Sequence, residues 1–290
     1  MSKLFGFVNL YKTNGVTSHD MVSFLRKLSG IKQIGHTGTL DPMAEGVLPM
    51  AIGNASRLIE YLQEDKGYDA EIQFGKISTT YDKEGDITLY SENKITEQDL
   101  LANLQNFKGI IKQIPPAYSA VHYNGKRLYE LARQGIIPDD IPMREVAINK
   151  LELVEFDYEN QTAKINVECS KGTYIRSLVN DIGMSLSCGA MMTGLTRTKS
   201  GKFQIVNAVK PEALSDTDDL KNYLINPVEV LSYNSYELSE FEYKKIVHGQ
   251  SLTTDKFQNN ETVMLLYNEN LVSMAEKQVD KLKIKKVLLV

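Results

Sequence analysis

The sequence predicts an α+β fold, and two observations carry this prediction. Helical and strand patterns follow one another in mixed order, without the steady strand–helix–strand alternation of a doubly wound parallel sheet. One strand pattern alternates cleanly between apolar and polar residues, which is typical of a sheet that buries one face. With 290 residues, 42% hydrophobic and 24% charged, the chain is long enough for a large soluble domain and a small one.

The first elements follow from local signals. Phe5–Tyr11 is expected to form a strand, and Asn14-Gly15 is a turn signal. A helix is predicted from Ser18, as its cap, to a stop at Gly30, because its apolar residues recur at helical spacing. A short strand is expected at Val47–Ile52 and a helix capped by Asn54 after it.

The middle of the chain alternates between strands and helices. In the predicted strand Tyr68–Phe74, every second residue is apolar, beginning with Tyr68. A helix is expected to start at Thr96 and to place its leucines on one face. Two strands are predicted at Glu145–Phe156 and Ala163–Cys169, followed by a helix whose apolar positions run from Ile175 to Leu186.

An irregular segment interrupts this rhythm at Gln113–Gly135. Pro115-Pro116 stops any helix there, and Asn124-Gly125 predicts a tight turn. A short basic helix is then expected to end at Gly135. The segment therefore reads as an excursion from the main body of the domain.

The C-terminal part predicts a small β-rich appendage. More strand is expected at Met191–Thr198 and at Phe203–Val206, and a domain boundary lies near residue 235. Beyond it the pattern predicts a short helix and three strands, with a hairpin at Asn268–Asn270. The expected domains are therefore 1–235 and 236–290. The expected helix is Glu240–His248, and the expected strands are Thr262–Tyr267, Leu271–Ala275 and Leu282–Val290.

Cysteine usage and hydropathy set limits on location. Cys169 and Cys188 are too few for a disulfide framework, which predicts two reduced, part-buried thiols. No apolar run approaches the roughly 20 residues needed to cross a bilayer, and the N-terminal residues lack the pattern of a secretory signal. We therefore expect a cytoplasmic protein with no membrane contact.

The charge distribution leaves an anionic partner open. The net charge of −4, taken alone, argues against nucleic acid, because phosphates attract positive charge. However, residues 108–135 hold five basic residues and one acid, and residues 164–202 hold six basic residues and two acids. Residues 211–242 hold eight acids and one lysine. A polyanion on one basic face and a solvated mixed-charge surface fit these counts equally well.

The stretch "GHTGTLDPMAEGVLPMAIG", from Gly35 to Gly53, has four interpretations. A phosphate loop is disfavoured, because the glycines have the wrong spacing and no Lys-Ser/Thr follows. His36, Asp41 and Glu45 are three reasonable metal ligands, but no second cluster supports them. Asp41 as a helix cap before Pro42 is the leading interpretation from these residues alone. The fourth interpretation is a catalytic carboxylate presented on a tight loop.

Four segments in one order resemble the TruB family of pseudouridine synthases over roughly residues 4–205. They are "GHTGTLDPMAEGVLPMAIGNASR", "KGYDAEIQFG", "QIPPAYSAVHYNGKRLYELARQG" and "CSKGTYIRSLVNDIG". The resemblance implies a pseudouridine synthase fold, with a mixed, mainly antiparallel sheet flanked by helices and a thumb insertion at about 112–145. The C-terminal region resembles the family's small PUA-like domain more weakly.

The resemblance also implies a reaction. Members of the family convert the uridine at position 55 in the T-arm of tRNA to pseudouridine, without cofactor or metal. By resemblance Asp41 is the nucleophile, attacking C1′ or C6, and Arg176 is its basic partner. A guanidinium suits a carboxylate, although it equally suits a phosphate. Tyr68 offers a ring to stack on the uracil and a hydroxyl for proton relay, and Tyr174 lines the same pocket.

The expected partner is the T-arm stem-loop of tRNA, with no obligate protein partner. An enzyme that acts on a stacked base must extrude it, and by resemblance His36 fills the vacated place. Lys126 and Arg127, on the thumb, are expected to contact the RNA backbone. The acidic stretch at 211–242 puts in doubt how much the C-terminal domain helps binding.

Two rival functions stay open. A non-catalytic RNA-binding or RNA-chaperone protein would need the basic thumb but not Asp41. A relative that acts on guided RNA within a larger particle would call for a partner-binding extension. A second, tRNA-folding role is compatible with the enzymatic hypothesis.

Overall fold

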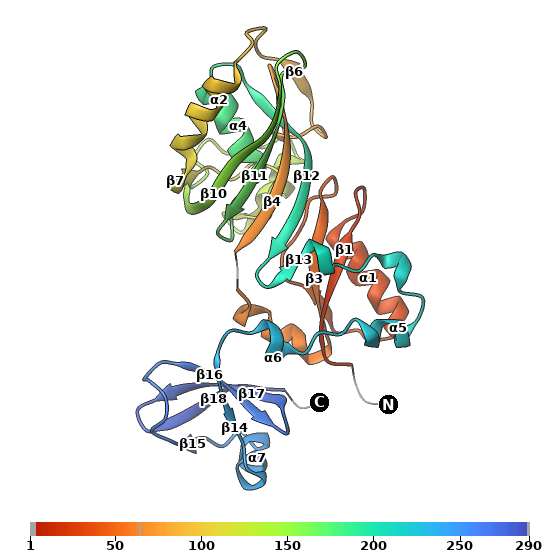
Figure 1. Ribbon diagram of the computed structural model, residues 1–290, viewed down its shortest axis with the longest axis vertical. Helices are drawn as coiled ribbons and strands as arrows, with labels where there is room; N and C mark the ends of the chain where they lie inside the picture. Colours follow the sequence, from red (N-terminus) through yellow and green to blue (C-terminus); the bar gives the residue numbers. More distant parts are fainter. Residues whose placement is uncertain (1–3, 64, 289–290) are drawn as a thin grey trace. The chain divides into compact units, whose positions relative to one another are not determined.

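The structure is a computed structural model that describes residues 4–63 and 65–288 (Figure 1). Within the described residues the chain forms two compact units. Unit 1 holds residues 4–42, 46–63 and 201–288, and unit 2 holds residues 43–45 and 65–200. Helices and strands are mixed in sequence, and most strand pairs are antiparallel, which confirms the predicted α+β class.

The N-terminal part of unit 1 consists of three paired strands, one α-helix and one 3₁₀ helix. β1 and β2 both pair antiparallel with β3. All residues of β3 after Glu45 are buried, because both faces of the strand are covered. The elements are β1 (Gly6–Lys12), α1 (Ser18–Ser29), β2 (Ile34–His36), β3 (Glu45–Ile52) and the 3₁₀ helix η1 (Gly53–Tyr61). The helix expected after a cap at Asn54 is therefore a 3₁₀ helix whose cap, Ile52, lies two residues earlier.

The cap of α1 differs from the prediction by one residue. Thr17, not Ser18, accepts the backbone N–H of Asp20, and the Asp20 carboxylate in turn accepts the N–H of Thr17. Ser18 was the wrong cap because its hydroxyl is bonded to the backbone of Leu40 instead. The predicted stop is confirmed, since Gly30 takes the left-handed conformation with φ 70°.

The remainder of unit 1 is a run of one short strand and four short helices, followed by a five-stranded sheet. The run comprises β13 (Phe203–Gln204), η3 (Ile205–Asn207), η4 (Pro211–Ala213), α5 (Thr217–Asn222) and α6 (Pro227–Val230). The sheet has the order β14-β16-β17-β18-β15, with only β14 parallel to its neighbour. Its elements are β14 (Asn234–Glu237), α7 (Glu240–Val247), β15 (Leu252–Thr253), β16 (Thr262–Tyr267), β17 (Asn270–Gln278) and β18 (Lys281–Val287).

The predicted C-terminal hairpin is present. Asn268 and Glu269 both have positive φ, which is the geometry of a two-residue turn between antiparallel strands. Residues 289 and 290 of the last expected strand lie outside the described residues. The domain boundary at residue 235 remains a prediction, and one apolar cluster spans it. Phe7 and Leu58 belong to the same buried cluster as Met264, Leu271 and Met274.

Unit 2 is an antiparallel sheet covered by two helices. Its strand order is β12-β4-β11-β10-β7, and α4 packs on β12 and β4 while α2 packs on β10 (Figure 1). The main elements are β4 (Lys66–Phe74), α2 (Glu97–Leu104), β7 (Gly109–Gln113), β10 (Arg144–Asp157), β11 (Thr162–Cys169), α4 (Ile175–Ser185) and β12 (Ala190–Ser200). The smaller ones are β5 (Lys76–Ser78), β6 (Ile87–Leu89), η2 (Gln105–Phe107), β8 (His122–Tyr123), β9 (Lys126–Arg127) and α3 (Leu128–Ala132).

Burial in unit 2 follows the predicted patterns with two exceptions. The alternate residues of β4 from Tyr68 to Phe74 are buried, and Thr96 caps α2. Leu101 is 43% exposed, because a helix of two turns buries only the stripe through Leu100 and Leu104. Cys169 and Cys188 are both free, as expected, but they are buried almost completely rather than in part.

Candidate active site

Asp41 lies on a tight turn, and no helix follows it. Pro42 and Met43 form the turn, and β3 begins two residues later. The helix-cap interpretation of Asp41 is therefore wrong, because the chain reverses into a strand. The carboxylate-bearing residue itself is partly exposed.

Hydrogen bonds hold the backbone on both sides of Asp41. The Leu40 N–H donates to the Ser18 hydroxyl at 2.9 Å, and that hydroxyl donates to the Leu40 carbonyl at 3.1 Å. The Pro42 carbonyl accepts from the Gly15 N–H at 2.9 Å and from the Lys12 ammonium at 3.1 Å. These bonds fix the turn to the β1–α1 connection and to the start of α1. The backbone from which the Asp41 side chain extends is therefore held in place.

Lys12 is the most unusual of these anchors. Its side chain is fully buried, and its ammonium donates to the carbonyls of Thr13, Val16 and Pro42 at 2.7 to 3.1 Å. A buried charge needs such partners, because desolvation would otherwise be costly. Lys12 was missed in the sequence, where it reads as an ordinary lysine at the end of a strand.

His36 is the last residue of β2 and is paired with Met50 of β3. It is partly buried, and the next backbone N–H, of Thr37, donates to the Pro49 carbonyl at 3.0 Å. His36 is therefore held at the end of an ordered strand and does not lie on a free loop.

In unit 2, Tyr68 stands on β4 with 9% of its surface exposed. It is paired with Val167 of β11 and with Arg197 of β12. Directly opposed residues of antiparallel strands share a face, so the buried guanidinium of Arg197, 1% exposed, stands beside Tyr68. Arg197 counted in the sequence only toward a basic stretch, because local patterns do not reveal which strands pair.

Arg176 lies in the first turn of α4 and is 6% exposed. Its Nη1 donates to the Thr80 carbonyl at 3.1 Å and lies 3.5 Å from Oδ2 of Asp82, while Nη2 donates to the Tyr118 carbonyl at 3.0 Å. The guanidinium therefore joins three separate segments of unit 2.

Asp82 is the acid that the sequence analysis missed at this place. It is 3% exposed and also accepts from the Thr80 hydroxyl at 2.5 Å and from the Glu84 N–H at 3.0 Å. A buried carboxylate of this kind is satisfied by several donors and holds a cation in place. It lies in a polar connection after β5, where no local pattern marks one acid as buried.

Tyr174 is the residue before α4 and is partly exposed. It lies two residues from Arg176, so the start of one helix carries two of the predicted site residues. Its backbone is bonded to Gln113, at the end of β7.

The thumb has the predicted tight turn at Asn124-Gly125, with φ values of 48° and 82° between β8 and β9. Lys126 is exposed, whereas Arg127 is half-buried and donates from Nη1 to the Ala120 carbonyl. The two basic residues, predicted as equivalent contacts, thus have different surroundings. The helix that follows, α3, is shorter than expected and ends three residues before Gly135.

The predicted site residues therefore fall into two groups. Asp41 and His36 belong to unit 1, whereas Tyr68, Tyr174, Arg176 and the thumb residues belong to unit 2. Among the residues that the structure describes, no set of three or more His, Cys, Asp or Glu side chains is grouped to hold a metal ion. The metal interpretation of His36, Asp41 and Glu45 thus receives no support.

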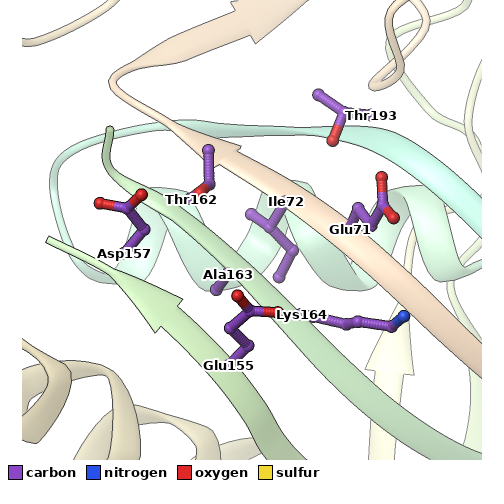
Figure 2. Close-up of a pocket in the computed structure, with 8 residues that line it drawn as sticks. All are labelled: Glu71, Ile72, Glu155, Asp157, Thr162, Ala163, Lys164 and Thr193. Atoms are coloured by element: carbon purple, nitrogen blue, oxygen red, sulfur yellow. The ribbon is translucent and has the colours of Figure 1, made fainter. Parts of the chain in front are cut away.

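A separate pocket of about 290 Å³ opens on the sheet of unit 2 (Figure 2). It is lined by residues of β4, β10, β11 and β12, namely Glu71, Ile72, Glu155, Asp157, Thr162, Ala163, Lys164 and Thr193. Three carboxylates against one ammonium make it a poor site for a phosphate. None of the predicted site residues lines it.

The sequence matches two family models in succession. Residues 26–175 match the N-terminal domain of the TruB family pseudouridylate synthases, and residues 176–231 match the tRNA pseudouridylate synthase B C-terminal domain.

Within the described ranges, no helix is long and apolar enough to span a membrane.

Relatives of nearly equal length carry one name. The chain is 37% identical to "tRNA pseudouridine synthase B" of Clostridium tetani (strain Massachusetts / E88), over 98% of this chain and 99% of the relative. It is 44% identical to the protein of the same name from Prochlorococcus marinus (strain NATL1A), over 90% of this chain and 83% of the relative.

Solved structures support the predicted fold. An H/ACA RNP bound to a substrate RNA containing 2′-deoxyuridine has a chain with a TM-score of 0.74 at 21% identity, covering 99% of this chain and 86% of that one. A Cbf5-Nop10-Gar1 complex gives a TM-score of 0.73 at 23% identity, covering 98% and 84%. The family model matched over residues 26–175 and the relatives matched over nearly the whole chain show that the chain belongs to the TruB family of pseudouridylate synthases.

Proposed function

We propose that this chain isomerises the uridine at position 55, in the T-arm loop of tRNA, to pseudouridine, with Asp41 as the nucleophile. The observation that carries the proposal is the turn at Asp41. Its backbone is fixed on both sides by Ser18, Gly15 and Lys12, and the residue is partly exposed. A carboxylate nucleophile must be held in place and remain accessible.

The chemistry needs a few defined groups. The glycosidic bond between N1 and C1′ breaks, the base turns, and C5 bonds to C1′ while the C5 proton leaves and N1 gains one. In this proposal Tyr68 stacks on the uracil and relays a proton, and Arg176 supplies positive charge to the reaction. Its guanidinium keeps a fixed position because Asp82 and two backbone carbonyls hold it. Tyr174 lines the pocket for the base.

The substrate is proposed to be tRNA, bound in the cytoplasm without an obligate protein partner. The relatives matched over nearly the whole chain are named for tRNA, which supports tRNA over a guided RNA. Because the target base must leave its stack, His36 is proposed to fill the vacated place. Lys126 and Arg127 would then contact the RNA backbone.

The test is Asp41→Asn, which keeps the shape of the side chain and removes its negative charge. We expect tritium release from C5-labelled uridine in a tRNA transcript to fall by about 10³-fold or more, while tRNA binding stays within about threefold. Asp255→Asn, at an exposed position of the C-terminal region, controls for the loss of one negative charge and should leave the rate unchanged.

A non-catalytic RNA-binding protein or RNA chaperone predicts the opposite pattern. In that case Asp41→Asn and Tyr68→Phe would have no effect, and removal of the charges at Lys126 and Arg127 would abolish function. Near-normal turnover by Asp41→Asn, with tRNA bound, would remove Asp41 from the mechanism.

A further inference from the structure

Three side-chain contacts tie the entry of the thumb to the first turn of α4. Gln113, the last residue of β7, makes the first of them through two hydrogen bonds. Its Nε2 donates to the Tyr174 carbonyl at 3.3 Å, and its Oε1 accepts from the Tyr174 N–H at 3.1 Å. The Gln113 side chain is almost fully buried, at 1% exposure. The amide thus clamps both backbone groups of one residue.

The other two contacts run in the reverse direction. The Ser177 hydroxyl donates to the Ile114 carbonyl at 2.9 Å, and Nη2 of Arg176 donates to the Tyr118 carbonyl at 3.0 Å. In all three contacts one partner is a backbone group. The contacts therefore fix the path of the main chain in residues 113–118 and at the start of α4, rather than the tips of two side chains.

Only one of the two Gln113 bonds serves the start of the helix. The Tyr174 carbonyl already accepts the first intrahelical bond, from the Leu178 N–H at 3.0 Å. The Tyr174 N–H, by contrast, is one of the donors that a helix start leaves without an intrahelical partner, so Oε1 of Gln113 also caps α4. The Gln113 amide therefore does more than cap α4: its second bond, from Nε2 to a carbonyl that the helix already uses, also places Tyr174 relative to the thumb.

We propose that Gln113 is a positioning residue that couples the thumb to the catalytic end of α4. RNA that fixes the thumb thereby fixes the backbone of Tyr174 and Arg176, with Ser177 as a second tie. The inference rests on the proposed function, in which Tyr174 and Arg176 act at the base. Catalysis is sensitive to such placement, since a shift of about 1 Å can cost about 100-fold in rate.

The test compares the chemical step with binding. Gln113→Ala removes both bonds, and we expect the single-turnover rate of tritium release at saturating tRNA to fall about tenfold or more. The dissociation constant for tRNA should stay within about twofold, because the amide faces α4 and not the surface. Ser177→Ala leaves the Gln113 clamp intact and is expected to lower the same rate by a smaller factor, which provides a second variant if Gln113→Ala folds poorly.

Gln113→Glu adds a readout that a purely structural role would not move. The carboxylate still accepts from the Tyr174 N–H but cannot donate to the Tyr174 carbonyl. A protonated carboxyl regains that donor, so the rate relative to the wild-type protein should rise as pH falls.

The chain offers a matched control in Gln161. Its side-chain amide clamps Ile95 in the same way, accepting from the Ile95 N–H at 2.9 Å and donating to the Ile95 carbonyl at 3.2 Å, just before α2. Gln161→Ala thus removes a similar buried clamp beside another helix, together with a bond from Nε2 to the Tyr158 carbonyl at 2.8 Å. It should lower stability comparably and leave the single-turnover rate within about twofold.

Three results would overturn the coupling. They are a rate within twofold of wild type for Gln113→Ala, an equal loss for Gln161→Ala, and a loss confined to tRNA affinity. The proposed function is judged separately. An inactive Asp41→Asn with a fully active Gln113→Ala rejects only the coupling, whereas an active Asp41→Asn rejects the proposed function itself.

Discussion

At the scale of single residues, Lys12 explains how a flexible sequence can present a fixed carboxylate. The glycines around Asp41 suggest a mobile loop, yet the Pro42 carbonyl is bonded to a buried ammonium and to a backbone N–H. The same ammonium also donates to the carbonyls of Thr13 and Val16. One side chain therefore links the β1–α1 connection to the turn. A buried lysine that holds three backbone carbonyls serves structure here.

Lys12→Met keeps the length of the side chain and removes its donors. We expect the free energy of unfolding to fall by about 2–3 kcal/mol, because buried carbonyls lose a partner. Urea denaturation measures the change. The control is Lys32→Met, at an exposed position, where the effect should stay within about 0.5 kcal/mol. Equal effects of the two substitutions would show that the buried ammonium does not stabilise the fold.

At the scale of elements, the thumb is organised by short-range hydrogen bonds. β8 and β9 have two residues each, and α3 has five. Such short elements need external support. The backbone N–H of Leu128 donates to the Val121 carbonyl and that of Tyr129 to the Ser119 carbonyl, at 2.8 and 3.0 Å. The Arg127 guanidinium adds a bond to the Ala120 carbonyl.

This organisation separates the two basic residues of the thumb. Lys126→Ala should weaken tRNA binding and lower the slope of log affinity against log salt by about one unit, without changing thermal stability. Arg127→Ala should weaken binding and also loosen the hairpin, because its partner carbonyl loses a donor. Binding titrations at several salt concentrations, together with melting curves, distinguish the two. An unchanged salt slope for Lys126→Ala would remove that residue from the phosphate contacts.

At the scale of the whole molecule, the C-terminal sheet shares its apolar cluster with the N-terminal elements. Met264, Leu271 and Met274 are buried with Phe7 and Leu58 in unit 1. The Arg57 guanidinium also donates to the Val287 carbonyl at 2.7 Å. A boundary placed at residue 235 would therefore cut through a buried cluster.

The fragment 1–235 tests this organisation. We expect it to melt several degrees below the full chain and to bind a hydrophobic dye, because removal of residues 236–290 takes away Met264, Leu271 and Met274 and so exposes Phe7 and Leu58. Calorimetry and dye fluorescence provide the measurements. If the fragment melted at the same temperature as the full chain, the C-terminal region would be an independent module.

Much of the fold was accessible from the sequence, because it depends on local patterns. The alternation of β4, the stop at Gly30 and the turn at Asn124-Gly125 need only neighbouring residues. The errors arose where a side chain had a distant alternative partner. Ser18 reads as a helix cap, but its hydroxyl is used by Leu40, so Thr17 takes the cap. Asp41 reads as a cap because an Asp-Pro pair resembles a helix start whatever follows it.

The sequence by itself determined the fold class, the order of most elements and, through four motifs, the family to which the chain belongs. The roles of Asp41, Tyr68 and Arg176 remain predictions that rest on those motifs. Only the tertiary structure decided which polar residues are buried together, as with Lys12 beneath the turn and Asp82 beside Arg176. The physical reason is that burial and partner choice depend on strand pairing and chain reversal between distant segments, which local periodicity does not encode.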